Sequence, residues 1–496
     1  MTEASGGRKP PSQGKRLSEV DVNAGGLRPR SPRRVIAIRP LKLLVAVALL
    51  VRFVVLFTGA WAEPTRVYPF SPDSPRYVTL ADTLLSHQTF GKSAEEGTIH
   101  LAVEKLRRAN ETLPPADANG LYPEAFRTPG YPAFLALFGG TNGLRVAYLA
   151  QCLIGAFASL CLVRIALTMG CRPRAALVAG WLWALHPAVV TADVLPLTES
   201  LFGSLALVGL ALSAHKVTPA GRVLPGLCIG FTALVRPLGL LYLPTAIILG
   251  WRTASRKWLA AGAMVLAAVV PAAVWAARNA STGNGPRVST VGEMNLYYYG
   301  AAYVISESRG EDWFTSWPAR VDQLTARLAG KLEPGADVFA LARKEALAEL
   351  KANPITTAKV AAKSQVKLAI DHSAPLAAGL YGVEYKPSGF FSDLLRGKFD
   401  SSKLTLRGLI ALPWSALNAL ITLLAVLGAV RAALRRRWAL VFACTIPIVL
   451  FSAATFPVGL ERFRLPFMPF LFVLAVCAIW PPERAAPPAP AAEKLI

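Results

Sequence analysis

Long apolar runs dominate this chain of 496 residues and constrain its fold more than any other feature. A helix that crosses a bilayer needs roughly 20 apolar residues, with about 17 as the working minimum, because the hydrocarbon layer is about 30 Å thick. Several of the runs are shorter than that or are broken by proline. Together they predict an all-α polytopic membrane protein with about ten transmembrane helices. The ten runs lie near residues 41–60, 143–168, 175–192, 199–214, 223–236, 237–251, 258–277, 407–429, 438–456 and 465–480.

The positions of the charged residues predict how these runs are oriented. The chain carries 53 Lys and Arg against 30 Asp and Glu, a net charge of +23, yet only 17% of its residues are charged. Nucleic-acid-binding proteins share the positive excess but are not this apolar, so we expect no nucleic-acid partner. With the N-terminus in the cytoplasm, the cytoplasmic segments hold 24 basic and 5 acidic residues. They are 1–42, 164–174, 215–222, 252–257, 430–437 and 481–496.

The positive-inside rule accounts for this distribution. It predicts a multi-pass protein of the cell (inner) membrane with both termini in the cytoplasm. The first apolar run begins past residue 40 and has no cleavage signal, so we expect it to remain as a membrane anchor.

The same orientation divides the chain into five parts. Residues 1–40 are rich in Pro, Gly, Ser and Arg and predict a disordered basic cytoplasmic tail. A transmembrane core at 41–277 contains a first outward loop at 61–141, and 278–406 is predicted as an outward-facing helical domain. C-terminal transmembrane helices follow at 407–480, and 481–496 is a second cytoplasmic tail.

The outward domain has its own helical signals. Phe339, Ala342, Ala346 and Leu350 recur at helical spacing, and Pro354 opens a further run. The tyrosines of the string Asn-Leu-Tyr-Tyr-Tyr-Gly at 295–300 are either an interfacial aromatic belt or the lining of a sugar site.

Six cysteines lie within or beside the apolar runs, and none lies in the two outward segments. No pair has metal-ligand spacing, so we interpret them as small apolar fillers without disulfides.

Asp73 is the first residue that suggests chemistry. It lies near the start of the first outward loop and precedes a stretch with helical apolar spacing, so it is either a helix N-cap or a functional carboxylate. The same loop closes with Phe-Arg-Thr-Pro-Gly-Tyr-Pro at 126–132, which places Arg127 at headgroup depth.

Further charged residues are predicted at the same depth. They are Asp193, Glu199, Arg236, Arg462 and Arg464. Glu199 has an alternative explanation as a first-turn acid that the helix dipole favours. Arg52 differs because it lies inside the first apolar run, where an arginine costs at least about 2.5 kcal/mol, so we expect it to face protein and pair with an anion.

Acids and arginines at headgroup depth suit a lipid-linked phosphosugar, whose tails lie in the bilayer and whose phosphate lies at its surface. Arginines neutralise a phosphate leaving group, and a carboxylate deprotonates the attacking hydroxyl.

The order of the motifs resembles family 39-like, polyprenyl-phosphate-dependent glycosyltransferases of the GT-C membrane fold. This group includes protein mannosyltransferases and the lipid A aminoarabinose and galacturonic acid transferases. The resemblance covers most of residues 40–480 and rests on five motifs in order. These are Asp73 with Tyr77 and Leu80-Ala81, the string at 126–132, Leu197-Thr198-Glu199, Arg236-Pro237, and Glu461-Arg462-Phe463-Arg464-Leu465-Pro466.

The resemblance implies a GT-C fold and identifies Asp73 as the general base. Many relatives carry a paired Asp-Glu there, whereas Ser74 follows here, and Arg127 stands where the aminoarabinose transferases have an acid. Glu124 and Glu199 are the candidates for a second acid, and Asp193 and Tyr77 are further candidates for sugar binding. No metal ligands are predicted, although a divalent metal remains possible.

We therefore expect a membrane enzyme that moves a hexose or pentose from a polyprenyl-phosphate carrier to a lipid, protein or polysaccharide acceptor on the outer face, by inverting displacement. Arg127, Arg236, Arg462 and Arg464 are the candidates for binding the donor phosphate. One alternative is a transporter or flippase for a lipid-linked sugar, although the sequence shows no internal repeat of the kind common in transporters. Another is a non-catalytic membrane scaffold, for which the acids and arginines have no role.

Overall fold

The computed structural model describes residues 36–482, apart from 72, 94–97, 216–217, 252, 372–373, 384–405, 458 and 460. Most of the predicted N-terminal tail, part of the outward domain and most of the C-terminal tail lie outside the described residues. Within them the chain is almost entirely helical, as predicted. Two short antiparallel strands, β1 (Gly91–Lys92) and β2 (Tyr122–Pro123), are the only β-structure in these ranges.

Four helical stretches in the described part of the chain are long and apolar enough to cross a membrane, and they identify a membrane protein. They are Ile38–Ala60, which comprises α1 (Ile38–Val55) and a π-helical turn; Gly140–Met169, which contains α5 (Leu144–Met169); α11 (Lys257–Ser281); and Leu412–Leu434 of α19 (Leu406–Leu434). Large apolar side chains on them, such as Leu50, Leu266 and Leu423, are exposed. A bilayer removes these side chains from water.

The other predicted spans are helical, and five of them form apolar helical segments of 10–17 residues. The run at 175–192 divides into α6 (Pro173–Leu185) and α7 (Pro187–Ala192), because Pro187 follows His186 and ends the preceding helix. The count of ten transmembrane helices is therefore not established by the structure. The other short apolar elements are α8 (Thr198–Ser213), α9 (Val223–Val235), the 3₁₀ turn Pro237–Tyr242 with α10 (Leu243–Trp251), α20 (Trp438–Ala454) and α21 (Met468–Ile479).

A buried ion pair between Arg52 and Asp193 links α1 to the chain that follows α7. The Arg52 side chain is fully buried, and its Nε lies 2.7 Å from Oδ2 of Asp193. Arg52 also donates to the Ala184 carbonyl at 2.8 Å, and the Ser200 hydroxyl donates to Asp193. This contact confirms the prediction that Arg52 faces protein and pairs with an anion. Five of the six cysteines are buried, as expected of apolar fillers.

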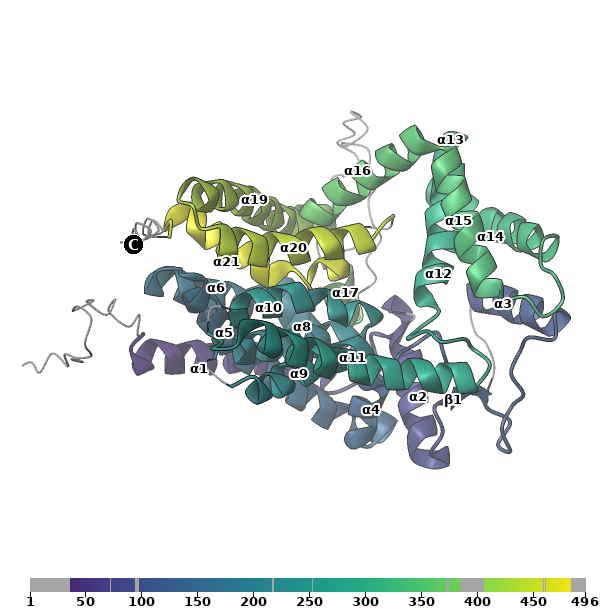
Figure 1. Ribbon diagram of the computed structural model, residues 1–496, viewed down its shortest axis with the longest axis horizontal. Helices are drawn as coiled ribbons and strands as arrows, with labels where there is room; N and C mark the ends of the chain where they lie inside the picture. The colour runs from purple at the N-terminus through teal and green to yellow at the C-terminus, as the bar shows by residue number, and fades with distance from the viewer. Residues whose placement is uncertain are drawn as a thin grey trace, which may run out of the picture. The chain divides into compact units, whose positions relative to one another are not determined.

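The two predicted outward segments share a second apolar core. Ile99, Val103 and Leu106 of α3 (Thr98–Ala109) pack in one cluster with Met294 and Tyr297. Figure 1 shows α3 beside α14 (Trp313–Ala329), although about 200 residues separate them in sequence. The remaining helices here are α12 (Val291–Asn295), a π-helical stretch (Leu296–Ala301), α13 (Ala302–Ser308), α15 (Val338–Ala352), α16 (Pro354–Ile370) and α17 (Ala374–Leu380).

Two of these helices were predicted from the sequence. Phe339, Ala342 and Ala346 of α15 are buried in the second core, and Pro354 is the first residue of α16. The Asp337 carboxylate accepts hydrogen bonds from the first backbone N–H groups of α15 and so fixes where the helix begins.

Candidate functional site

The Arg-Thr-Pro-Gly-Tyr-Pro string at 127–132 packs against the C-terminal end of α9 and so positions Arg127. The Thr128 hydroxyl donates to the Val235 carbonyl at 3.0 Å, at the end of α9. A Cβ on Gly130, at the start of α4 (Gly130–Leu137), would lie only 2.7 Å from the Leu234 carbonyl oxygen, so only glycine allows this approach. The string therefore docks on the end of α9, next to Arg236.

Asp73 lies where three distant parts of the sequence meet. It is the first residue of α2 (Asp73–His87) rather than a residue preceding the helix. Its Oδ1 lies 3.1 Å from Nη2 of Arg127, and its Oδ2 lies 2.9 Å from Nη2 of Arg462. Each carboxylate oxygen is thus held by its own guanidinium.

The two arginines decide the charge state of Asp73. Burial alone raises the pKa of this carboxyl, but Arg462 and Arg127 outweigh that effect and hold it well below its usual range. Burial lowers the pKa of Arg462, and Asp73 more than offsets this, so its pKa is raised overall. All three groups are therefore charged at neutral pH, and Asp73 in this state is a weak base.

A second acid–arginine pair lies close by. Oε1 of Glu199, in the first turn of α8, lies 2.8 Å from Nη1 of Arg236. The ring of Phe463 connects the pairs, with its centroid 5.7 Å from the guanidinium carbon of Arg236 and 5.2 Å from that of Arg462. The structure therefore brings together Asp73, Tyr77, Arg127, Glu199, Arg236 and Arg462.

Tyr77 lies one helical turn beyond Asp73 and inside this cluster. The guanidinium carbon of Arg127 lies 5.4 Å from the centroid of its ring. Burial raises the pKa of its hydroxyl, and the charges of the two acid–arginine pairs all act on it. Tyr77 is thus placed as a hydrogen-bond donor at neutral pH.

A small apolar cavity with about 240 Å³ of empty space opens beside the cluster. Glu199 and Arg462 contribute the charged groups of its wall. The rest of the lining is apolar apart from one threonine, and includes Ala188, Leu376 and Leu465. The cavity therefore offers an apolar surface that ends at an arginine.

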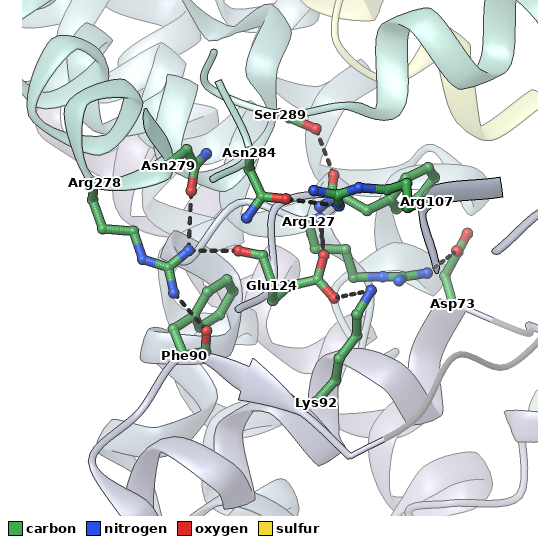
Figure 2. A network of polar contacts seen from close by, with 11 residues as sticks. Asp73, Phe90, Lys92, Arg107, Glu124, Arg127, Arg278, Asn279, Asn284 and Ser289 are labelled. Atoms are coloured by element: carbon green, nitrogen blue, oxygen red, sulfur yellow. Dashed lines mark hydrogen bonds and ion pairs between the residues drawn. The ribbon is translucent and has the colours of Figure 1, made fainter. Parts of the chain in front are cut away.

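Glu124 lies behind the cluster and holds the Arg127 backbone (Figure 2). One carboxylate oxygen accepts hydrogen bonds from the N–H groups of Phe126, at 2.5 Å, and Arg127, at 2.9 Å. The other lies 3.5 Å from Nζ of Lys92. Burial raises the pKa of Glu124, but Lys92 and Arg127 lower it to about 2 overall. Glu124 is thus a fixed anion that positions Arg127.

Two predicted site residues lie elsewhere. Arg464 is buried and donates to the Ala369 carbonyl at 2.6 Å and the Thr422 hydroxyl at 2.9 Å, which joins α16 to α19. Asp193 forms the ion pair with Arg52 inside the bundle. Both interactions stabilise helix packing, and neither residue contacts Asp73.

The three neighbouring tyrosines have separate roles. Tyr297 and Tyr298 are buried in the second core, where their hydroxyls meet the Leu324 carbonyl and the Thr325 hydroxyl. Tyr299 is half-buried; burial raises the pKa of its hydroxyl, and the charge of Asp73 adds to this effect. The ring of Tyr299 stacks on that of Trp317, with centroids 5.4 Å apart.

Sequence reasoning missed the residues that support Arg127. Lys92 comes from a strand of two residues, and Arg278 donates to the carbonyls of Glu124 and Phe90, each at 2.7 Å (Figure 2). Neither belongs to a motif, so no local signal marks them. In the part of the chain that the structure describes, no three His, Cys, Asp or Glu side chains gather as metal ligands.

No family model and no curated protein matches this sequence. Among solved structures, the chain is similar to the archaeal oligosaccharyltransferase AglB from Archaeoglobus fulgidus in complex with an inhibitory peptide and a dolichol-phosphate. The TM-score is 0.43 at 15% identity, over 89% of this chain and 50% of that chain. For the oligosaccharyltransferase of the same organism with Zn and sulfate, the TM-score is 0.38 at 15% identity, over 88% and 48% of the two chains. The chain thus spans about half the length of these proteins.

Proposed function

We propose that this protein is an integral membrane glycosyltransferase of GT-C type. It transfers a hexose or pentose from a polyprenyl-phosphate carrier to an acceptor on the outer face of the membrane, by inverting displacement. The observation that carries the proposal is the Asp73 carboxylate, held between Arg127 and Arg462 beside an apolar cavity.

The charges of the cluster suit an anionic phosphodiester. Three guanidinium groups face two carboxylates, which leaves one positive charge in excess. Within the described residues, Nε of Arg127 is buried without a hydrogen-bond partner, and the whole side chain is only 7% exposed. A buried donor without a partner costs roughly 1–3 kcal/mol, and a phosphate oxygen supplies the missing acceptor.

Donor binding also converts Asp73 into a base. When the phosphate oxygens take over Arg127 and Arg462, the carboxylate loses the two cations that lower its pKa. The Asp73 carboxylate is then buried without nearby cations, so its pKa rises and it accepts a proton more readily. Asp73 therefore becomes basic only when the leaving group is in place.

In the transfer step, the acceptor hydroxyl attacks the anomeric carbon and gives its proton to Asp73. The bond from that carbon to the phosphate oxygen breaks, and the phosphate leaves with the electron pair. The arginines stabilise the charge that develops on it. The first isoprenoid unit of the carrier lies in the apolar cavity at Arg462, and the tails continue into the bilayer.

The topology proposed with this function follows the positive charges. Both termini lie in the cytoplasm, about ten helical runs cross or enter the inner membrane, and the segments at 61–141 and 278–406 face outward. Asp73, Arg127 and Arg462 then lie at the outer surface. The acceptor is a lipid, a protein or a polysaccharide.

The test is Asp73→Asn in purified protein supplied with polyprenyl-phosphate sugars. The amide keeps the shape of the side chain but cannot take the proton, so we expect transfer to fall about 10²- to 10⁴-fold. Asp117→Asn is the matched control, because this half-buried acid caps a turn in the same loop through Oδ1, an oxygen that the amide keeps, and the change should leave the rate unchanged. Thermal unfolding in detergent checks that both variants are folded.

Undiminished transfer by folded Asp73→Asn protein would remove Asp73 as the base. Movement of the lipid across vesicles without sugar transfer would favour a flippase instead.

A further inference from the structure

A second pocket lies where the first loop meets the second segment. It encloses about 510 Å³ that no atom fills, part of it open solvent, and its walls come from β1, β2, α3 and α15 together with the chain around Asn284 and Met294. It is distinct from the apolar cavity at Arg462, because the two share no lining residue. The proposed donor chemistry leaves this pocket without a role.

The lining combines flat aromatic groups with polar groups. Phe126 and Tyr122 contribute rings, and Lys92, His100, Glu104 and Asn284 contribute hydrogen-bonding groups. His100 and Phe126 form one corner, with ring centroids 4.3 Å apart and nearly perpendicular planes. A ligand that fits has C–H faces to lie on rings and hydroxyl groups at its edge to meet the polar atoms.

The polar groups exclude the two other obvious ligands. A hydrocarbon chain would remove Lys92 and Glu104 from water without replacing their hydrogen bonds. A polyanion would meet the carboxylate of Glu104, and the guanidinium of Arg107 in the same wall is already bonded to the Asn284 amide oxygen and to the carbonyls of Thr112 and Gly283. Burial, with help from Arg127 and Lys92, lowers the pKa of His100 to about 3, so its neutral ring can both donate and accept.

The pocket is joined to the reaction centre by one peptide bond. Phe126 lies in its wall, and Arg127, the next residue, binds Asp73. The Glu124 carboxylate holds the N–H groups of both residues, and the Ser289 hydroxyl donates to the Phe126 carbonyl at 2.5 Å (Figure 2). A ligand bound against Phe126 therefore lies at a fixed position relative to the base.

We infer that this pocket binds a saccharide portion of the acceptor. A sugar ring of the acceptor lies in the pocket, and the hydroxyl that receives the transferred sugar belongs to the adjacent part of the acceptor, which reaches Asp73. The inference rests on the proposed function for its place in the reaction. Saccharide binding itself is measurable without any transfer.

The test uses a block that is added after folding. Glu104→Cys places a thiol in the pocket wall, and a bulky methanethiosulfonate reagent then fills the space through a disulfide that a reductant removes. Lys105→Cys is the matched control, because Lys105 is the next residue of α3, is exposed and does not line the pocket. Wild-type protein treated with the same reagent controls for the native cysteines.

Binding is read by saturation-transfer difference NMR with three probes: methyl mannopyranoside, methyl galacturonopyranoside and methyl arabinofuranoside. We expect ring-proton signals from at least one probe with wild-type and Lys105→Cys protein. The signals should fall to background in modified Glu104→Cys protein and return after reduction. Asp73→Asn protein should bind the probe as the wild type does.

Two results would overturn the inference: no signal from any of the three probes, or a signal that survives the block. Transfer that persists in Asp73→Asn protein would overturn the proposed base and leave the binding result standing. The two proposals thus fail in separate measurements.

Discussion

Removal of Arg462 gives a direct measure of how strongly the arginines suppress Asp73. Two unit charges 4 Å apart interact by about 4 kcal/mol at an effective dielectric constant of 20. The Asp73 side chain is 32% exposed and Arg462 is 20% exposed, so solvent screening reduces this value. About 1.4 kcal/mol corresponds to one pKa unit, and we therefore expect Arg462→Met to raise the pKa of Asp73 by about two units.

The sign of the effect follows from the charges. Asp73 must be ionised to act as a base, so activity is lost as the pH falls through its pKa. That pKa lies well below the usual range in the wild type, and its rate should be constant from pH 8 to pH 4. In Arg462→Met the pKa moves toward that of an ordinary Asp, about 3.9, but Arg127 still lowers it, so the rate at pH 4 should fall below the rate at pH 7 by less than about half.

The assay is kcat/KM for sugar transfer between pH 4 and 8, with each variant scaled to its own rate at pH 7. This scaling separates the protonation of Asp73 from the loss of phosphate binding. Arg127→Met should move the profile in the same direction but less far, because Arg127 lowers the pKa of Asp73 less than Arg462 does. Arg320→Met removes a comparable ion pair, with Glu311, and should leave the profile unchanged. Profiles that superimpose on the wild type would refute the suppression of Asp73 by arginine.

Two further perturbations test the framework around the site. Arg52→Met leaves the Asp193 carboxylate buried without its cation, so we expect detergent unfolding to show a loss of about 3–5 kcal/mol of stability. Adding Asp193→Leu should restore part of that loss. An unchanged unfolding midpoint in Arg52→Met would show that the ion pair is not needed. Gly130→Ala pushes a methyl group against the Leu234 carbonyl, so it should cost about 1–3 kcal/mol of stability and displace Arg127. Gly262→Ala is the control, because a Cβ there meets no atom within contact distance. Equal transfer rates for the two variants would argue against the docking of the string on α9.

Depth in the membrane explains which parts of the site could be predicted. Hydropathy and charge place a residue along the bilayer normal, and this coordinate correctly grouped Asp73, Arg127 and Arg462. It says nothing about position within the membrane plane. Arg464 was therefore placed in the same group, although its side chain points to α16 and α19.

The predicted partner of Arg52 was more secure because its reason is energetic. A buried guanidinium requires an anion wherever the fold places it, and Asp193 supplies one. The lengths of the spans were less predictable, because hydropathy does not register that Pro187 ends α6 at His186. Lys92 could not be found from sequence, since its role depends on the pairing of two strands 30 residues apart.

The distances along the chain between the members of the cluster have a consequence for biosynthesis. Asp73 and Arg462 are 389 residues apart in sequence. A ribosome has therefore made the first loop long before the residue that completes the cluster exists. Until then Asp73 lacks one of its two cations. The finished site thus requires that the chain be inserted at least as far as residue 462, and a product truncated before that residue would carry Asp73 with only one of its two cations.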